Sequence, residues 1–213
     1  MSEHGMIPFH TLRFVGRMNA HISHDIKNVT ATISETAGLL EDLLAMQASG
    51  KPVDPERFTK LSTRIIQQVD RGNNLLGNMN ILAHGTDDPV SVMDVNKTLR
   101  MMAELARCVP YYRSVGFTPA PDEHTLTTRP YCLQEFIYLV YRSAFQAMHQ
   151  DDALELSANP DGGGCAVTIA GLPPELDAAY TVHLNELAAT LGATMEQGEN
   201  SLTLRLPAAL PEG

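Results

Sequence analysis

The chain has 213 residues, of which 44% are hydrophobic and 19% are charged, a balance typical of a globular protein with a sizeable core. Its net charge is −10 at pH 7, and the excess lies in the second part: residues 1–86 hold eight basic and eight acidic side chains, whereas residues 87–213 hold seven and 17. Because an acidic surface repels phosphates, we expect no nucleic acid partner.

No apolar run approaches the ~20 residues that cross a bilayer, and residues 1–10 lack the basic and apolar segments of a signal peptide. The three cysteines, Cys108, Cys132 and Cys165, are widely spaced and match no metal-binding motif. We therefore expect a cytoplasmic protein without a membrane span, in which reduced cysteines serve as small buried hydrophobic residues.

A first long helix is predicted over residues 11–49, where no proline occurs. Apolar or small residues recur there in steps of three and four, close to the 3.6-residue helical repeat. This stripe consists of Val15, Met18, Ile22, Ile26, Val29, Ile33, Ala37, Leu40 and Leu44. Such a helix is far longer than the average of ~11–12 residues, and this length is typical of a bundle or a coiled coil.

A second helix is predicted after the break at residues 50–53, because Asp54 can cap it and Pro55 fits its first turn. Its apolar stripe consists of Leu61, Ile65, Val69, Gly72, Leu76, Met79 and Ala83. Two long helices joined by a short turn form an antiparallel hairpin, which leaves part of both stripes in water. We therefore expect a homodimer in which two hairpins make a four-helix bundle.

Shorter elements after residue 89 predict a second domain. We expect helices over residues 95–108, 131–148 and 176–191, and strands over residues 115–118, 125–129, 153–158, 165–170, 193–197 and 201–206. The fold class is then α+β: a helical hairpin domain over residues 1–86, followed by a two-layer domain with a mostly antiparallel sheet over residues 87–213.

The most informative side chains of the first helix come just after Ile22, the centre of the buried stripe. At about 100° per residue, His24, Lys27 and Asn28 fall on the outer face. Asp25 falls on the shoulder beside the imidazole. A neutral, unblocked imidazole nitrogen can accept a phosphoryl group, and a neighbouring carboxylate can orient the ring or take its proton. The same angles also fit an ordinary solvated helix face.

His24, Asp25 and Asn28 resemble the H-box of bacterial histidine kinases, in which an acidic residue directly follows the acceptor histidine and an asparagine stands four positions after it. The family usually has proline next, where this chain has Val29, so we expect no local bend. The likeness covers both helices and the domain that follows. It implies that the hairpin dimerises, accepts a phosphoryl group on His24 and exchanges it with an aspartate of a response-regulator receiver domain.

The resemblance assigns catalytic roles to His24 as acceptor, to Asp25 as its orienting or proton-handling neighbour, and to Asn28 as a contact for water or a phosphoryl oxygen. Because the turn lies near residue 52, we place Asn80 at the level of His24. The residues expected to contact a partner are Lys27, Val29, Thr32, Asn78 and Asn80, with His84 at the same rim. A polar helix end is the alternative for the residues of the second helix.

The second domain resembles the ATP-binding domain of the same kinases with its nucleotide-binding residues replaced. Two asparagines that hold Mg²⁺ and phosphates in the family align with Leu139 and Ser143, and the aspartate that reads adenine aligns with Ile169. The glycine-rich lid has no counterpart, so no backbone nest for phosphates is expected. We expect no intrinsic cofactor, and Mg²⁺ is expected on the partner receiver domain.

These features favour a histidine phosphotransferase of a phosphorelay that is loaded by another protein, such as an upstream hybrid kinase. Two alternatives stay open: a divergent ATP-dependent sensor histidine kinase core, and a non-catalytic dimeric scaffold for signalling partners. A metal site is not expected, because His21 and His24 form a pair without further ligands.

Overall fold

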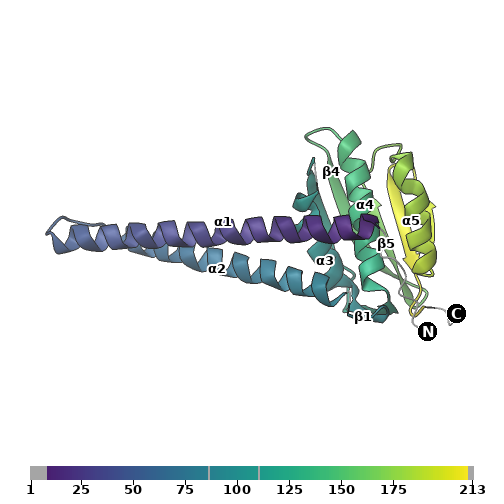
Figure 1. The fold of residues 1–213 in the computed structure, drawn as a ribbon, viewed down its shortest axis with the longest axis horizontal. Coiled ribbons are helices and arrows are strands. Elements are labelled where there is room, and N and C mark those ends of the chain that lie inside the picture. The colour runs from purple at the N-terminus through teal and green to yellow at the C-terminus, as the bar shows by residue number, and fades with distance from the viewer. Residues whose placement is uncertain (1–8, 86, 110, 211–213) are drawn as a thin grey trace. The chain divides into compact units, whose positions relative to one another are not determined.

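The computed structural model describes residues 9–85, 87–109 and 111–210 (Figure 1). These residues form an α+β structure with five α-helices and a mixed sheet. The chain divides into two compact units. The first, the hairpin unit, is Gly16–Asn80; the second, the α/β unit, consists of Met1–Val15 and Ile81–Gly213.

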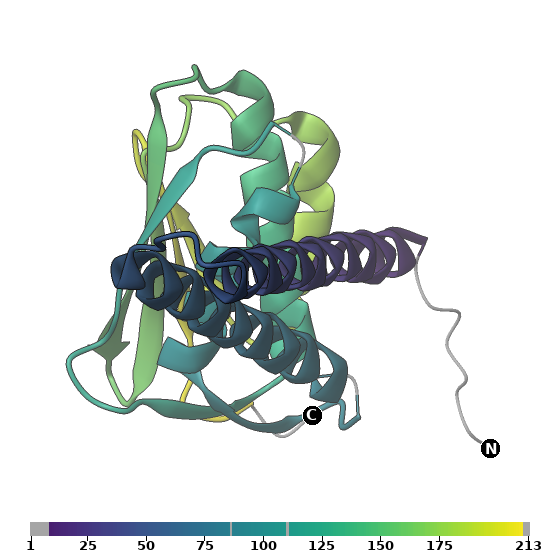
Figure 2. The same cartoon turned by 90° about the vertical axis from the view of Figure 1, so that its left-hand side faces the viewer.

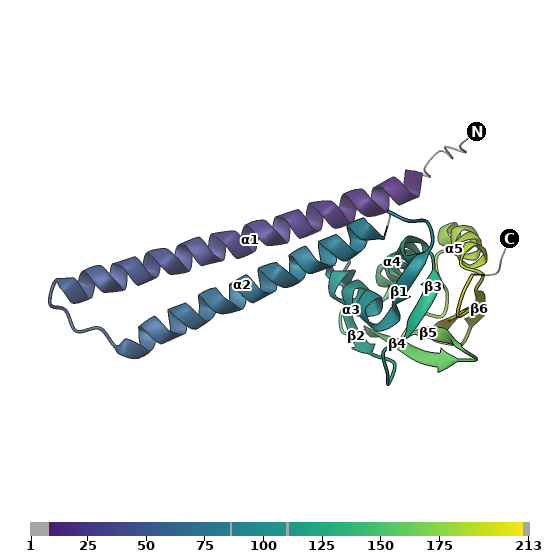
Figure 3. The same ribbon diagram turned by 90° about the horizontal axis from the view of Figure 1, so that it is seen from below.

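The hairpin unit is built from the greater part of helices α1 (Phe9–Ala48) and α2 (Pro55–His84), which run antiparallel (Figures 1 and 3). The predicted cap of α2 is confirmed, since Asp54 Oδ1 accepts a hydrogen bond from the backbone N–H of Glu56 at 2.9 Å. The two helices approach closely where Gly72 faces Val29: a Cβ atom at Gly72 would lie 3.3 Å from Val29 Cγ1. A small residue on α2 therefore sets the spacing at this level.

Burial along the hairpin unit differs from the predicted stripes. The buried positions of α1 that recur every seven residues are Ile22, Val29, Thr36 and Leu43. In contrast, Leu44 is 56% exposed, although the prediction placed it in the stripe. A seven-residue repeat keeps one helix face toward a neighbouring helix, which an unbroken 3.6-residue repeat does not.

On α2 the buried stripe passes through Leu75 and Leu82, and the expected burial of Val69 and Leu76 is wrong. Ile66, Val69 and Leu76 are 58%, 44% and 44% exposed. We call these three residues the outer apolar stripe. The hairpin unit thus has an inner face and a second apolar face that no described residue covers.

The α/β unit contains a five-stranded sheet with the strand order β2-β4-β5-β7-β6. Its strands are β2 (Ser114–Thr118), β4 (Ala153–Asp161), β5 (Gly164–Ala170), β6 (Thr194–Gln197) and β7 (Ser201–Leu206). The prediction of a mostly antiparallel sheet is confirmed, because only β2 and β4 pair in parallel. The turn between β4 and β5 uses Gly162 and Gly163, whose φ angles of 55° and 89° suit a two-residue hairpin turn.

A separate two-stranded sheet joins β1 (Ser91–Asp94) to β3 (Thr125–Thr128) in antiparallel register. The sequence predicted β3 but not β1. The four residues of β1 follow Pro89 closely and show no period-two pattern of apolar side chains, so pairing with a distant strand creates this element.

Three helices lie on one face of the five-stranded sheet (Figures 2 and 3): α3 (Val95–Leu105), which continues into the 3₁₀ turn Ala106–Cys108, α4 (Pro130–Ala147) and α5 (Ala178–Thr190). Helix α4 is buried on nearly all sides, as a helix without a polar face must be. Leu133, Phe136, Ile137, Val140 and Tyr141 all have at most 2% of their surface exposed. They meet the inward-facing residues of β4, β5 and β7 and form the core of this unit.

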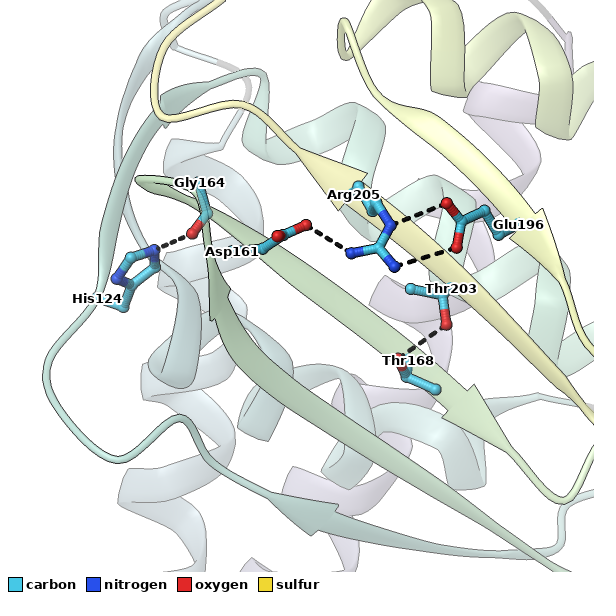
Figure 4. A network of polar contacts seen from close by, with 7 residues as sticks. All are labelled: His124, Asp161, Gly164, Thr168, Glu196, Thr203 and Arg205. Atoms are coloured by element: carbon cyan, nitrogen blue, oxygen red, sulfur yellow. Dashed lines mark hydrogen bonds and ion pairs between the residues drawn. The ribbon is translucent and has the colours of Figure 1, made fainter.

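The opposite face of the sheet is polar (Figure 4). Arg205 on β7 donates to Asp161 on β4 at 2.7 Å and to both carboxylate oxygens of Glu196 on β6, at 3.0 and 3.1 Å. Thr168 and Thr203 share a hydrogen bond across β5 and β7 at 3.0 Å. Cross-strand pairs of this kind fix the register of neighbouring strands.

The first turns of α1 belong to the α/β unit, so the compact units do not coincide with a division after residue 86. The reason is an aromatic contact: the ring centroid of Phe14 lies 5.6 Å from that of Tyr131 and 4.9 Å from that of Tyr138, both on α4. Phe14 is 1% exposed. No helix within the described residues combines the length and apolarity needed to cross a bilayer.

Candidate functional site

His24 lies on the surface of the hairpin unit, as its helical phase predicts. Its side chain is 69% exposed, whereas that of Asp25 is 15% exposed. Lys27 and Asn28 are also exposed. The outer face of α1 therefore presents an imidazole with a half-buried carboxylate on its shoulder.

Two neighbours on α1 compete for the same imidazole nitrogen. His24 Nδ1 lies 3.5 Å from Asp25 Oδ1 and 3.3 Å from Asn28 Nδ2. A carboxylate can only accept, so the Asp25 contact requires a proton on Nδ1; the Asn28 amide group donates, so its contact requires a bare Nδ1. In the neutral ring the other nitrogen carries the complementary role. Asp25 thus favours the tautomer in which Nε2 has a free lone pair.

Nε2 of His24 meets no hydrogen-bonding group within the described part of the chain. The nitrogen that points away from Asp25 and Asn28 is therefore open to an incoming electrophile. In nucleophilic catalysis a carboxylate commonly orients the reacting residue; here Asp25 would hold the protonated Nδ1 while Nε2 attacks.

Arg71 of α2 is a site residue that the sequence analysis missed. Its Nη2 donates to Asp25 Oδ2 at 3.5 Å, and its side chain is 45% exposed. The two oxygens of Asp25 therefore face different partners, His24 and Arg71. Only the pairing of the two helices brings Arg71 here, so no local pattern in α1 could have indicated it.

The residues predicted to contact a partner divide by burial. Lys27 and Asn80 are exposed, and Thr32 is half-buried with its hydroxyl donating to the carbonyl of Asn28 at 2.9 Å. Val29 is 5% exposed, as its place in the apolar stripe predicts, and Asn78 is 9% exposed, so neither offers an exposed side chain to a partner. Val29 instead packs against α2 at Gly72.

His84 belongs to the α/β unit rather than the hairpin unit. There its Nδ1 lies 2.6 Å from Asp87 Oδ2, and both side chains are well exposed. This local pair fits the alternative of a polar helix end.

In the α/β unit, the three positions that the resemblance aligns with nucleotide-binding residues are Leu139, Ser143 and Ile169. All three side chains are buried and take part in packing or helix capping. Leu139 and Ile169 are core residues with 3% and 1% exposure. Ser143 is 2% exposed, and its Oγ accepts a hydrogen bond from the backbone N–H of Asp177 at 2.6 Å. Asp177 caps α5. The serine therefore holds the start of α5 against α4, where a metal ligand would be needed.

Side chains also fill the contact between α4 and α5. Buried Glu135 lies 3.3 Å from His183 Nε2, and Arg142 stacks over the ring of Tyr180 at 5.4 Å. A cavity of about 290 Å³ lies between α5 and strands β6 and β7. Among the described residues, its lining includes Glu175 but no lysine or arginine, so it does not suit a triphosphate.

Cys165 has the character expected of a buried small residue, whereas Cys132 is half-buried. Cys165 is fully buried, and burial raises its pKa to about 11. Burial, and then the charge of Glu135, raise the pKa of the half-buried Cys132. The side chain of Cys108 lies outside the described residues. In the part of the chain that the structure describes, no group of three or more His, Cys, Asp or Glu side chains could hold a metal ion.

No family model matches the chain, and no curated protein does. Solved structures do. A bacterial phosphotransferase is 13% identical, with 96% of this chain and 99% of that chain covered and a TM-score of 0.49. A histidine kinase from Burkholderia phymatum is 14% identical over 95% and 100% of the two chains, with a TM-score of 0.46.

The ATP-binding domain of PrrB from Mycobacterium tuberculosis is 20% identical and covers 57% of this chain and 98% of its own length, with a TM-score of 0.47. The three structures are thus named as a phosphotransferase, a histidine kinase and an ATP-binding domain. Because every one of these TM-scores is below 0.5, the functional proposal rests on the residues of the chain itself.

Proposed function

We propose that this protein is a histidine phosphotransferase that accepts a phosphoryl group on His24 and exchanges it with the aspartate of response-regulator receiver domains. The observation that carries the proposal is the geometry of His24. Its ring is exposed, Nδ1 faces Asp25, and Nε2 is open. A partner protein can reach this nitrogen without any rearrangement of α1.

The proposed transfer joins Nε2 of His24 to phosphorus. The lone pair of Nε2 attacks the phosphoryl group of a receiver aspartyl phosphate, the N–P bond forms and the P–O bond to the receiver breaks. The electron pair of that bond returns to the receiver carboxylate. The imidazole becomes cationic while Nδ1 keeps its proton, and the Asp25 carboxylate stabilises this charge. The reverse sequence returns the group to a receiver.

Lys27 and Asn80, both exposed, are the proposed contacts for the receiver, together with Thr32. The side chain of Lys27 provides positive charge for the acidic pocket in which a receiver binds Mg²⁺. Asn28 is proposed to leave Nδ1 during transfer and to donate to a phosphoryl oxygen. No step requires a metal ion held by this chain.

The proposed assembly is a homodimer in which two hairpin units form a four-helix bundle. The outer apolar stripe of Ile66, Val69 and Leu76 supports this proposal, because a row of exposed apolar residues along a helix is typical of an interface. A second copy would cover it with the same stripe, as a two-fold dimer requires.

The phosphoryl group is proposed to come from another protein rather than from ATP. Leu139 and Ile169 have no side-chain atoms that coordinate Mg²⁺ or read adenine, and Ser143 is engaged with the start of α5. The cavity beside α5 offers no lysine or arginine in its described lining to neutralise phosphates. An upstream hybrid kinase with its own receiver domain is a source of the required chemistry.

The second candidate function is a divergent ATP-dependent histidine kinase core, which the prevalence of histidine kinases among the similar structures favours. It requires that ATP bind without the residues named above. A third, the non-catalytic scaffold, requires only the dimer. The three candidates differ in whether His24 is labelled, and from which donor.

The test uses the full chain and a panel of receiver domains that have been loaded with labelled phosphate and separated from the donor. We expect label on the wild type from at least one receiver, and none on His24→Gln. His21→Gln is the matched control, because His21 is an exposed histidine on the same helix, and it should be labelled like the wild type. Absence of label from every receiver would support the scaffold.

A further inference from the structure

Arg71 has no role in the transfer step derived above, yet it reaches Asp25 from the second helix. We infer that Arg71 is a positioning residue: it holds the Asp25 carboxylate in the orientation that sets the tautomer of His24. The inference deepens the proposed function and depends on it for its kinetic consequence. The tautomer itself can be measured whether or not phosphate is transferred.

The two carboxylate oxygens of Asp25 contact different residues. Oδ2 lies 3.5 Å from Arg71 Nη2 and Oδ1 lies 3.5 Å from His24 Nδ1. Because the carboxylate is planar, fixing Oδ2 toward α2 leaves Oδ1 directed at the ring. Asp25 is 15% exposed, so water competes less for its oxygens than for those of a fully exposed side chain.

The second step is the competition at Nδ1. Asn28 approaches this atom at 3.3 Å and favours the opposite tautomer, in which Nε2 carries the proton and cannot attack. Without Arg71, the carboxylate of Asp25 loses one contact that restrains its rotation, and Asn28 competes more strongly for Nδ1. Arg71 thus shifts the balance toward the nucleophilic ring.

The third step is that Arg71 contributes little to folding at this position. It is 45% exposed, and ion pairs with that degree of exposure stabilise proteins weakly. We therefore assign to Arg71 the role of orienting the Asp25 carboxylate. The guanidinium is planar and directs its N–H groups along fixed lines, whereas a lysine ammonium acts as a point charge.

The experiment compares Arg71→Gln with the wild type in the full chain. The nitrogen chemical shifts of His24, assigned by loss of its signals in His24→Gln, report the fraction of rings with the proton on Nδ1. We expect Arg71→Gln to lower the ratio of the Nδ1–H to the Nε2–H tautomer about two- to tenfold, the equilibrium factor that one net hydrogen bond is worth. Arg71→Lys should restore part of the ratio.

Arg64→Gln is the matched control, because Arg64 is an exposed arginine on α2 two turns before Arg71. It should leave the ratio unchanged. A tautomer ratio that is the same in Arg71→Gln and the wild type would overturn the inference. If the ratio falls but no receiver transfers phosphate even to the wild type, the positioning role holds and the proposed function fails.

The kinetic readout is single-turnover transfer from a labelled receiver. For Arg71→Gln we expect the rate at saturating receiver to fall in proportion to the measured fraction of rings with the proton on Nδ1, by at most the same factor as the tautomer ratio, with the half-saturating receiver concentration little changed. A loss confined to the half-saturating concentration would identify Arg71 as a receiver contact and overturn the positioning role.

Discussion

The hairpin unit and the α/β unit differ in burial at the positions that the resemblance to histidine kinases singles out. In the hairpin unit, His24 and Asn28 lie on the surface, and the helix core beneath them is formed by other residues. In the α/β unit, the positions that correspond to nucleotide ligands lie inside the core or hold α5 against α4. A site that acts on a partner protein must stay exposed, whereas a site without a ligand can be rebuilt as packing. Under the proposed function, we therefore expect the chemistry in the hairpin unit rather than in the α/β unit.

The largest expected effect concerns the outer apolar stripe of the hairpin unit. Ile66→Asp should dissociate the proposed dimer, because each of the two copies then places a carboxylate in the apolar interface. We expect the dissociation constant to rise about 1000-fold, or ~4 kcal/mol. Sedimentation velocity at several concentrations measures it. Gln67→Asp, at the next exposed position, should leave the assembly unchanged, and a wild type that is monomeric throughout would refute the dimer.

A smaller effect is expected in the core of the α/β unit. Leu139→Asn introduces the residue type that the resemblance to histidine kinases places here, but it removes a buried leucine and leaves an amide without water. We expect the free energy of unfolding to fall by ~2–4 kcal/mol in urea titrations, without binding of labelled ATP. Leu139→Met keeps the volume and should cost less than ~1.5 kcal/mol. A Leu139→Asn variant that gained ATP binding at full stability would mean that the pocket persists.

The smallest predicted effect uses the pKa of Cys165, which burial raises to about 11 from the ordinary 9.0. Below pH 9 both the folded and the unfolded chain keep the proton. As the pH rises from 9 to 11 the unfolded chain loses it first, so stability falls. Cys165→Ala should therefore lose ~2 kcal/mol less than the wild type over this range in urea titrations. Equal losses in the two proteins would show that Cys165 is not protected by the core.

Much of the fold could be predicted because its signals are local. The proline-free stretch before Gly50 and the cap at Asp54 define α1 and α2, and both helices match their expected bounds closely. The turn at Gly162 and Gly163 likewise places β4 and β5. The strand β1 could not be predicted, since its four residues acquire their structure from pairing with β3.

The residues of the candidate site likewise differ in whether a local pattern could predict them. Helical phase placed His24, Asp25 and Asn28 correctly, because all three lie on one continuous helix. It missed Arg71, which only the pairing of α1 with α2 brings to Asp25. It also assigned Val69 and Leu76 to the buried stripe, because the period alone does not say which of two apolar faces a helix turns inward.

Phosphotransfer to His24 is tested most directly by labelling the purified full chain with radioactive ATP alone and, in parallel, with a labelled receiver domain. We expect acid-labile, base-stable label on the wild type from the receiver, loss of that label in His24→Gln, and no label from ATP. Rapid labelling of His24 by ATP alone would refute the proposed function and would identify the α/β unit as a working kinase domain.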